Sequence, residues 1–106
     1  MRRAILATLG LAMAAGTIVA ADQKTVTQKG KAFSVAAITI KPGDEVVFKN
    51  DDDATHNVFS TTKGQEFNLK VQLPGSSSTQ VFKTEGVAEV QCAFHPQMKL
   101  KITVAK

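Results

Sequence analysis

The sequence predicts an all-β domain, a Greek-key β-sandwich of two sheets. After residue 22 the apolar residues recur with a period near two, which is the spacing of half-buried strands and not of an amphipathic helix. Turn-forming residues separate these stretches at intervals of about 8 to 12 residues. Roughly seven short strands at this spacing are typical of two antiparallel sheets packed face to face.

The expected strands run from Thr25 to Val104. They cover 25–27, 37–40, 45–48, 66–71, 88–92 and 99–104. Turn-forming segments separate them: Lys-Pro-Gly-Asp at 41–44, Asn-Asp-Asp-Asp at 50–53, Lys-Gly at 63–64, Pro-Gly-Ser-Ser-Ser at 74–78 and Glu-Gly at 85–86. We therefore expect the run of three serines, 76–78, to be a loop.

Residues 1–21 have the composition of a secretory signal peptide. Arg2 and Arg3 precede an uncharged apolar stretch, and the small residues at its end offer a cleavage site. The alternative is an uncleaved membrane anchor, because about 18 apolar residues can span a bilayer. The Ala- and Gly-rich composition favours cleavage, so we expect a functional domain at 22–106, released into the periplasm without a membrane anchor.

The charge of that domain excludes one class of function. Cleavage removes both arginines, which leaves 11 lysines against 9 acidic residues and a net charge of about +2. The lysines are scattered, with no basic run and no interleaved aromatics, so the pattern does not indicate a nucleic-acid binder. About 85 residues are enough for one compact domain and too few for two.

Four side chains in the expected domain can bind a soft or borderline metal: His56, Cys92, His95 and Met98. Three of them lie within seven residues, and we expect Cys92 to end one strand and Lys99 to begin the next, with a tight loop between them. His56 would approach from the region where the strand 46–50 and its acidic turn end. One thiolate, two imidazoles and a weaker thioether form the ligand set of single-copper electron-transfer sites, and Met is a poor zinc ligand.

This ligand set argues against an enzyme. Four protein ligands leave no open position for substrate or water, which a catalytic metal requires. Each of the four residues alone could be an ordinary core or loop residue, so a metal-free sandwich used for adhesion or assembly is an alternative. Metal ligation is favoured because a single free thiol in an exported protein would be open to oxidation.

Two segments of the chain resemble the cupredoxins, the small type I blue copper proteins. One is Ile38–Asn50 followed by His56-Asn57-Val58, and the other is Cys-x-x-His-x-x-Met at 92–98. The short gap before Met98, with Pro directly after the second His, is more similar to amicyanin than to plastocyanin. The resemblance covers nearly the whole expected domain and implies an eight-stranded, cupredoxin-like monomer that holds one copper ion.

The resemblance also implies a role for each site residue. His56, Cys92 and His95 would be the equatorial ligands and Met98 the axial ligand. The backbone N–H of Asn57 would donate a hydrogen bond to the Cys92 thiolate and so tune the reduction potential. Pro96 has no N–H and cannot supply a second such bond.

By the same resemblance, His95 would lie at the surface inside an apolar docking patch. Phe94, Pro96 and Pro74 are the candidates for this patch, with Lys99 and Lys63 around it for transient electrostatic docking. The implied function is an electron carrier that cycles copper between Cu(I) and Cu(II), with an amine dehydrogenase and a c-type cytochrome as redox partners. A copper-handling protein for resistance or delivery is the alternative, because the ligands alone do not separate the two.

The chain departs from the family pattern in several places. Ala88 and Val90 stand before the cysteine where aromatics are common, and the sequence contains no Tyr or Trp. Ala93-Phe94 replaces a more polar pair, and Leu100 stands where a Gly is usual. We expect these changes to alter the choice of partner and to shift the site from a blue toward a green spectrum.

Overall fold

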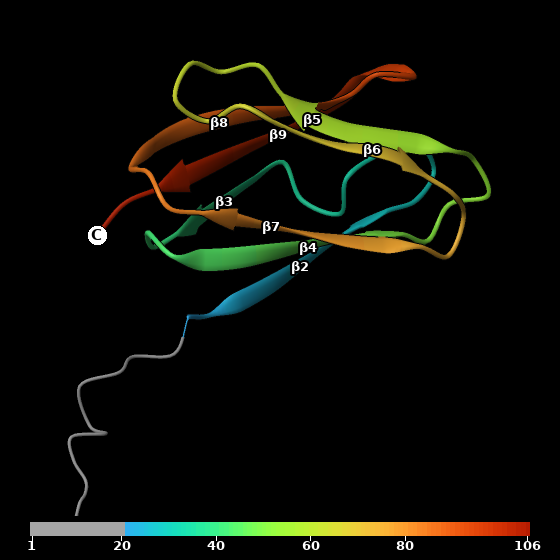
Figure 1. Ribbon diagram of the computed structural model, residues 1–106. Coiled ribbons are helices and arrows are strands. Elements are labelled where there is room, and N and C mark those ends of the chain that lie inside the picture. The colour runs from blue at the N-terminus through green and yellow to red at the C-terminus, as the bar shows by residue number, and fades with distance from the viewer. Residues whose placement is uncertain (1–20) are drawn as a thin grey trace, which may run out of the picture.

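The computed structural model describes residues 21–106, and every regular element in that range is a β-strand. The eight strands are β2 Gln23–Gln28, β3 Ala37–Ile40, β4 Asp44–Asn50, β5 His56–Ser60, β6 Phe67–Gln72, β7 Ser77–Phe82, β8 Gly86–Cys92 and β9 His95–Val104. They form a three-stranded sheet, β2-β4-β7, packed on a five-stranded sheet, β3-β9-β8-β5-β6 (Figure 1). The predicted all-β sandwich of two sheets is confirmed. The expected signal segment lies outside the described residues apart from its last position, and within 21–106 there is no helix that could cross a bilayer.

The expectation that both sheets are wholly antiparallel is wrong. β2 pairs with β4 in parallel, and β3 pairs with β9 in parallel. The chain leaves β2 in the small sheet, runs back along β3 in the large sheet and then returns in β4. Because it reverses direction twice between β2 and β4, those two strands run the same way, and their pairing has to be parallel.

The serine run is also not simply a loop. Ser77 and Ser78 are the first residues of β7 and pair with Lys49 and Phe48 of β4, so only Ser76 remains in the turn. β7 is an edge strand whose side chains are exposed or half-buried except for Phe82. Its sequence therefore lacks the apolar alternation that predicts six of the other strands; β5, His56–Ser60, is likewise absent from the expected set.

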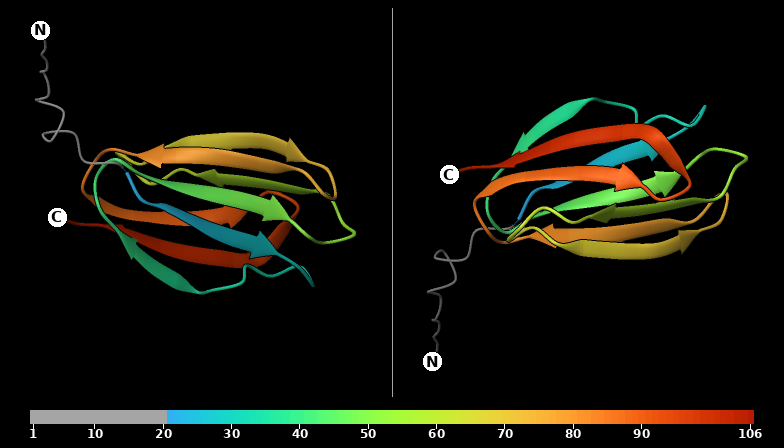
Figure 2. Two further views of the ribbon diagram at one scale, coloured as in Figure 1. Left: turned by 90° about the horizontal axis from the view of Figure 1, so that it is seen from below. Right: turned by 90° about the horizontal axis from the view of Figure 1, so that it is seen from above.

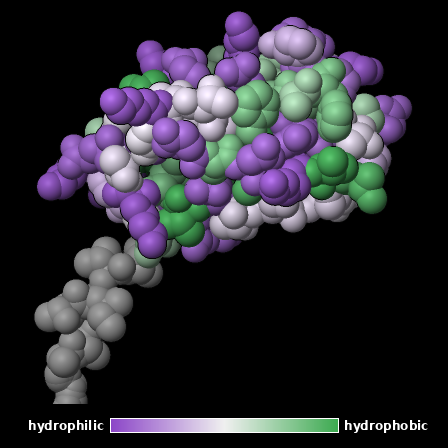
Figure 3. Space-filling model, turned by 45° about the horizontal axis from the view of Figure 1, so that its top comes forward, coloured by the Kyte–Doolittle hydropathy of each residue, from purple (hydrophilic) through white to green (hydrophobic). Residues whose placement is uncertain are grey.

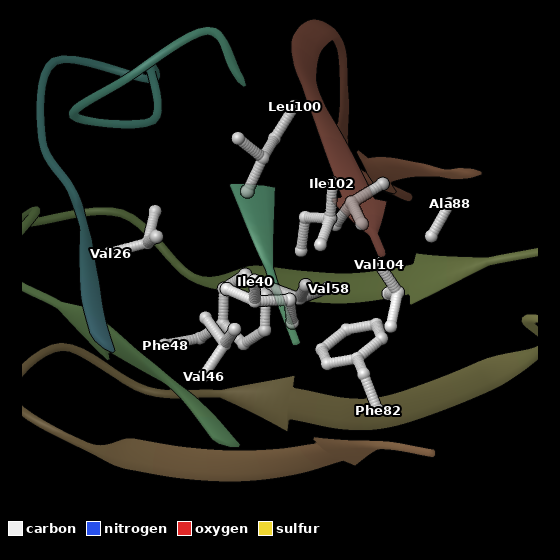
Figure 4. Packing of buried hydrophobic residues seen from close by; sticks show 11 residues of the cluster. Val26, Ile40, Val46, Phe48, Val58, Phe82, Ala88, Leu100, Ile102 and Val104 are labelled. Atoms are coloured by element: carbon white, nitrogen blue, oxygen red, sulfur yellow. The ribbon is translucent and has the colours of Figure 1, made fainter. Parts of the chain in front are cut away.

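The core lies between the two sheets. Its buried members are Val26, Ile40, Val46, Phe48, Val58, Phe82, Ala88, Val90, Leu100, Ile102 and Val104. Figure 4 shows side chains from both sheets pointing toward one another across this layer. Cys92 and Met98 are 2% and 1% exposed but do not belong to this cluster, so the two buried sulfur atoms occupy a separate region.

A β-bulge in β6 decides which of its residues face inward. His56 pairs with Gln72 and Asn57 with Val71, but the register shifts by one residue before Phe59 pairs with Asn68. Lys70 adopts a φ of 64° at the bulge, and its N–H donates to Asn68 Oδ1 at 2.7 Å. The alternation predicted for 66–71 therefore breaks, so that Gln72 is 1% exposed while Val71 is 57% exposed.

We call the end of the sandwich that carries the β8–β9 turn, residues 93–94, the hairpin end. Three other connections lie at this same end in both views of Figure 2: the loop 51–55, the segment 29–36 and the β6–β7 turn. Lys63 lies in the β5–β6 connection, at the opposite end of β5 from His56 (Figure 1). The expectation that Lys63 flanks a patch around His95 is therefore wrong, because the length of β5 separates them.

We expect Leu100→Ala to lower the free energy of unfolding of the apo-domain by about 2 to 5 kcal/mol, because Leu100 is 1% exposed and truncation leaves a cavity. Urea titration followed by circular dichroism measures the change. Leu73→Ala is the matched control, since Leu73 is 62% exposed and should change the value by no more than about 0.5 kcal/mol. Equal effects of the two variants would contradict the core assignment.

Candidate metal centre

Cys92 is the last residue of β8, in the interior of the large sheet. It pairs with Val58 of β5 on one side and with His95 of β9 on the other. Because β9 already begins at His95, the turn between the strands consists of Ala93 and Phe94 alone. The expected loop from Cys92 to Lys99 is thus too long. The regular ladder ends at Gln91 and Lys99, where the register shifts, and one further pair then holds Cys92 and His95 side by side.

His56 begins β5 and does not end the preceding strand. It stands two residues before Val58, and alternate residues of a strand face the same side of the sheet, so His56 and Val58 both point inward. The His56 side chain is fully buried. Since Val58 pairs with Cys92, the imidazole of His56 lies over the end of β8.

Three donor atoms from β5, β8 and β9 converge at the hairpin end. Cys92 Sγ lies 3.5 Å from His56 Nδ1 and 3.7 Å from His95 Nδ1, and the two Nδ1 atoms are 3.1 Å apart. The imidazole rings meet edge to face with centroids 4.8 Å apart. Within residues 21–106 these three side chains form a group compact enough to hold a metal ion.

The triangle has the size that a bound metal requires. Metal–imidazole bonds of about 2.0 Å and metal–thiolate bonds of about 2.3 Å, arranged at about 120° in a plane, separate the two nitrogens by about 3.5 Å and each nitrogen from the sulfur by about 3.7 Å. The observed triangle matches these distances or is a few tenths of an ångström smaller. Each of the three side chains can offer one lone pair to a cation placed between them. The residues present therefore fit a metal ion held by two nitrogens and one sulfur.

Met98 lies at the hairpin end of the inward-facing row of β9. Met98, Leu100, Ile102 and Val104 are buried in alternation, while the first three residues of the strand are half-buried or exposed. Met98 is 1% exposed and stands outside the hydrophobic core cluster. Its place beside the donor triangle is consistent with the weaker fourth ligand expected from the sequence.

The backbone around Cys92 supplies a hydrogen bond to its sulfur. The N–H of Asn57 donates to Cys92 Sγ at 3.3 Å, and the N–H of Ala93 donates to the carbonyl of Asn57 at 3.0 Å. The first bond stabilises negative charge on the sulfur, and the second ties the hairpin turn to β5. Pro96, in the first part of β9, offers no N–H.

Asp52 contacts the far side of the His56 ring, and sequence reasoning had assigned it only to an acidic turn. Its Oδ2 lies 3.0 Å from His56 Nε2, and its side chain is only 7% exposed. The backbone N–H of Lys31, followed by the ring of His56, holds the pKa of the Asp52 carboxyl well below its usual range. The spacing Asp-x-x-x-His was the only sequence signal for this contact.

The expected patch residues lie at the hairpin end. Phe94 is 52% exposed, Pro96 is exposed and His95 is partly exposed. Val71 and Leu73, 57% and 62% exposed, also lie at this end because β6 ends beside His56, and sequence reasoning missed both. Figure 3 shows apolar surface gathered toward the right-hand end of the face it displays, which is the hairpin end.

Comparison with known proteins places this geometry in a family. The sequence model of the family described as copper binding proteins, plastocyanin/azurin family, matches residues 20–105. The chain is 30% identical to the methylamine utilization protein MauL of Methylorubrum extorquens, over 99% of this chain and 94% of that protein.

Solved structures of two cupredoxins are similar to this domain in fold. A purple cupredoxin from Nitrosopumilus maritimus superposes with a TM-score of 0.69 and 26% identity, covering 77% of this chain and 99% of the other. Amicyanin from Paracoccus versutus superposes with a TM-score of 0.71 and 25% identity, covering 86% and 89%. With a family match along the whole described domain and a donor triangle that suits copper, the chain belongs to the plastocyanin/azurin family of copper-binding proteins.

Proposed function

We propose that this protein is an exported electron carrier that holds one copper ion through His56, Cys92, His95 and Met98 and is not an enzyme. The observation that carries the proposal is the convergence of three donor atoms within 3.1 to 3.7 Å at one end of a closed sandwich. Two imidazoles, a thiolate and a thioether suit both oxidation states of copper.

Copper in such a site supplies a reversible one-electron Cu(II)/Cu(I) couple. The chain's own residues supply the rest. Cys92 provides a thiolate whose charge the Asn57 N–H stabilises at 3.3 Å, and His56 is buried with no exposed surface. Four ligands drawn from this set leave no position for a substrate, which supports a carrier over a catalyst.

Rigidity favours electron transfer over copper delivery. The triangle is built from three neighbouring strands of one sheet, β9-β8-β5, and His56, Cys92 and His95 all stand at paired positions of these strands. The burial of Cys92 and His56 also restricts access to a competing copper acceptor. A site that can neither open easily nor relax much between oxidation states is suited to passing an electron.

His95 is the ligand nearest to solvent and the proposed exit for the electron. Phe94 and Pro96 lie beside it on the surface, and Leu73 and Val71 extend the apolar area along the end of β6. A weakly charged apolar patch suits brief docking with a redox protein. The similarity to a methylamine utilization protein supports an amine dehydrogenase as electron donor, with a c-type cytochrome as acceptor and a monomeric carrier between them.

We expect the domain 22–106, purified without copper, to develop an intense visible thiolate-to-copper absorption band on addition of Cu(II). Cys92→Ala should abolish the band because the thiolate is its source. Met98→Gln should keep the band and lower the midpoint potential, since the axial ligand tunes the couple. Absorption spectra and voltammetry measure both effects. A band that survives Cys92→Ala would refute the ligand assignment.

The carrier and copper-delivery hypotheses differ in how tightly the protein should retain copper in each oxidation state. For a carrier we expect a reversible one-electron wave, with copper retained after repeated oxidation and reduction in the presence of a chelator. Loss of the ion to the chelator in one oxidation state would favour delivery. Equilibrium dialysis after each oxidation and each reduction measures the copper that the protein retains. The Cys92→Ala variant is the control for nonspecifically bound copper.

The export proposal is tested with the full chain. Expressed in a Gram-negative host, the protein should be recovered from the periplasm with a mass that corresponds to a start near residue 22. Replacing Arg2 and Arg3 by Glu should reduce the exported fraction because the positive n-region is lost. Recovery of the uncleaved chain from the membrane fraction would support the anchor alternative.

A further inference from the structure

The loop 51–55 has a defined conformation that presents one carboxylate to His56. Asp52 Oδ2 accepts the N–H of Lys31 at 2.7 Å and faces His56 Nε2 at 3.0 Å, while Oδ1 accepts the N–H of Asp53 at 2.9 Å. Its neighbours Asp51 and Asp53 are exposed, whereas Asp52 is largely shielded. One of three consecutive aspartates is thus selected for the interior.

Asn50 fixes the loop from its two ends. Its side-chain Oδ1 accepts the N–H of Asp52 at 2.9 Å, and its Nδ2 donates to the carbonyl of Ala54 at 2.9 Å. The same Nδ2 donates at 3.0 Å to the carbonyl of Gln72, the residue paired with His56 in the neighbouring strand. Asn50 is fully buried, so these bonds are made without competition from water.

A second buried amide extends this support to the other sheet. Gln72 Oε1 accepts from Gln28 Nε2 at 2.8 Å, and Gln72 Nε2 donates to the carbonyl of Phe48 at 2.9 Å. β2 and β4, which carry Gln28 and Phe48, belong to the small sheet, while Gln72 belongs to the large sheet. The loop that holds Asp52 is therefore anchored to both layers.

We propose that Asp52 is the positioning residue for His56, keeping its ring in the tautomer with the proton on Nε2 and the Nδ1 lone pair directed at the metal site. The proposal rests on the assignment of His56 as a copper ligand. A neutral imidazole has one donor and one acceptor nitrogen, and a carboxylate that faces Nε2 can only accept. Nδ1 is therefore left as the acceptor, 3.5 Å from Cys92 Sγ.

A carboxylate on the second nitrogen also makes the ring a stronger ligand. The negative charge beside Nε2 makes Nδ1 a stronger electron-pair donor to the metal, which favours the more highly charged Cu(II) over Cu(I). The contact adds a link between the segment 29–36, through Lys31, and the metal centre. His56 is thus oriented by the fold before any ion binds.

The first test needs no copper and no change at Asp52. ¹⁵N NMR of the two histidine side chains in the copper-free wild-type domain, at mildly alkaline pH where an ordinary imidazole is neutral, should show His56 with its proton on Nε2. A proton on Nδ1 would overturn the proposal. A His95→Gln variant assigns the signals, because only two histidines are present.

The second test compares Asp52→Asn with Asp51→Asn. Both variants remove one negative charge, but Asp51 is the adjacent residue and is exposed. We expect Asp52→Asn to weaken Cu(II) binding about 10- to 100-fold, to weaken Cu(I) binding less and to raise the midpoint potential. Each tenfold difference between the two losses corresponds to about 59 mV. In Asp51→Asn all three quantities should stay close to wild type.

Identical copper affinities and potentials in the two variants would refute the role of Asp52 while leaving the proposed function intact. A wild-type domain that binds no copper would instead refute the proposed function, and a His56 proton on Nδ1 would refute the positioning role independently. If Asp52→Asn fails to fold, the wild-type NMR measurement still tests the proposal, because a proton on Nδ1 would overturn it.

Discussion

The metal site depends on one constraint: two imidazole nitrogens and a sulfur are held 3.1 to 3.7 Å apart with their lone pairs facing one another. Donor atoms from three different strands keep this spacing only if the rest of the fold holds them in place. The sandwich does this by using the ends of three paired strands rather than flexible loops. Main-chain hydrogen bonds between β5, β8 and β9 keep the three donor atoms at this spacing.

The hydrophobic core and the metal site are physically separate parts of the same interior. The core cluster fills the middle of the sandwich, while the buried sulfurs of Cys92 and Met98 lie beyond it at the hairpin end. The inward row of β9 contributes to both, with Met98 at one end and Leu100, Ile102 and Val104 continuing into the core. Core packing therefore sets the position of the strand that carries two of the four proposed ligands.

Buried polar residues fill the interior between the apolar core and the hairpin end. Gln28, Asn50 and Gln72 are at most 1% exposed, and their hydrogen bonds connect the two sheets at the hairpin end. The oxygen Oε1 of Gln28 is buried without a partner among the described residues. This polar layer gives the loop 51–55 a defined shape, and so gives Asp52 a defined direction.

The sequence by itself determined the fold class and the four candidate ligands, because strand periodicity and the small stock of Cys, His and Met are properties of single residues and their spacing. It did not reveal β7, since the edge strand that begins Ser77-Ser78 buries too little to alternate. Nor could it show that a bulge at Lys70 turns Gln72 inward and Val71 outward, or that Asp52 meets His56. These features were decided by the tertiary structure, because register and the choice of one aspartate among three depend on hydrogen bonds between segments distant in the chain.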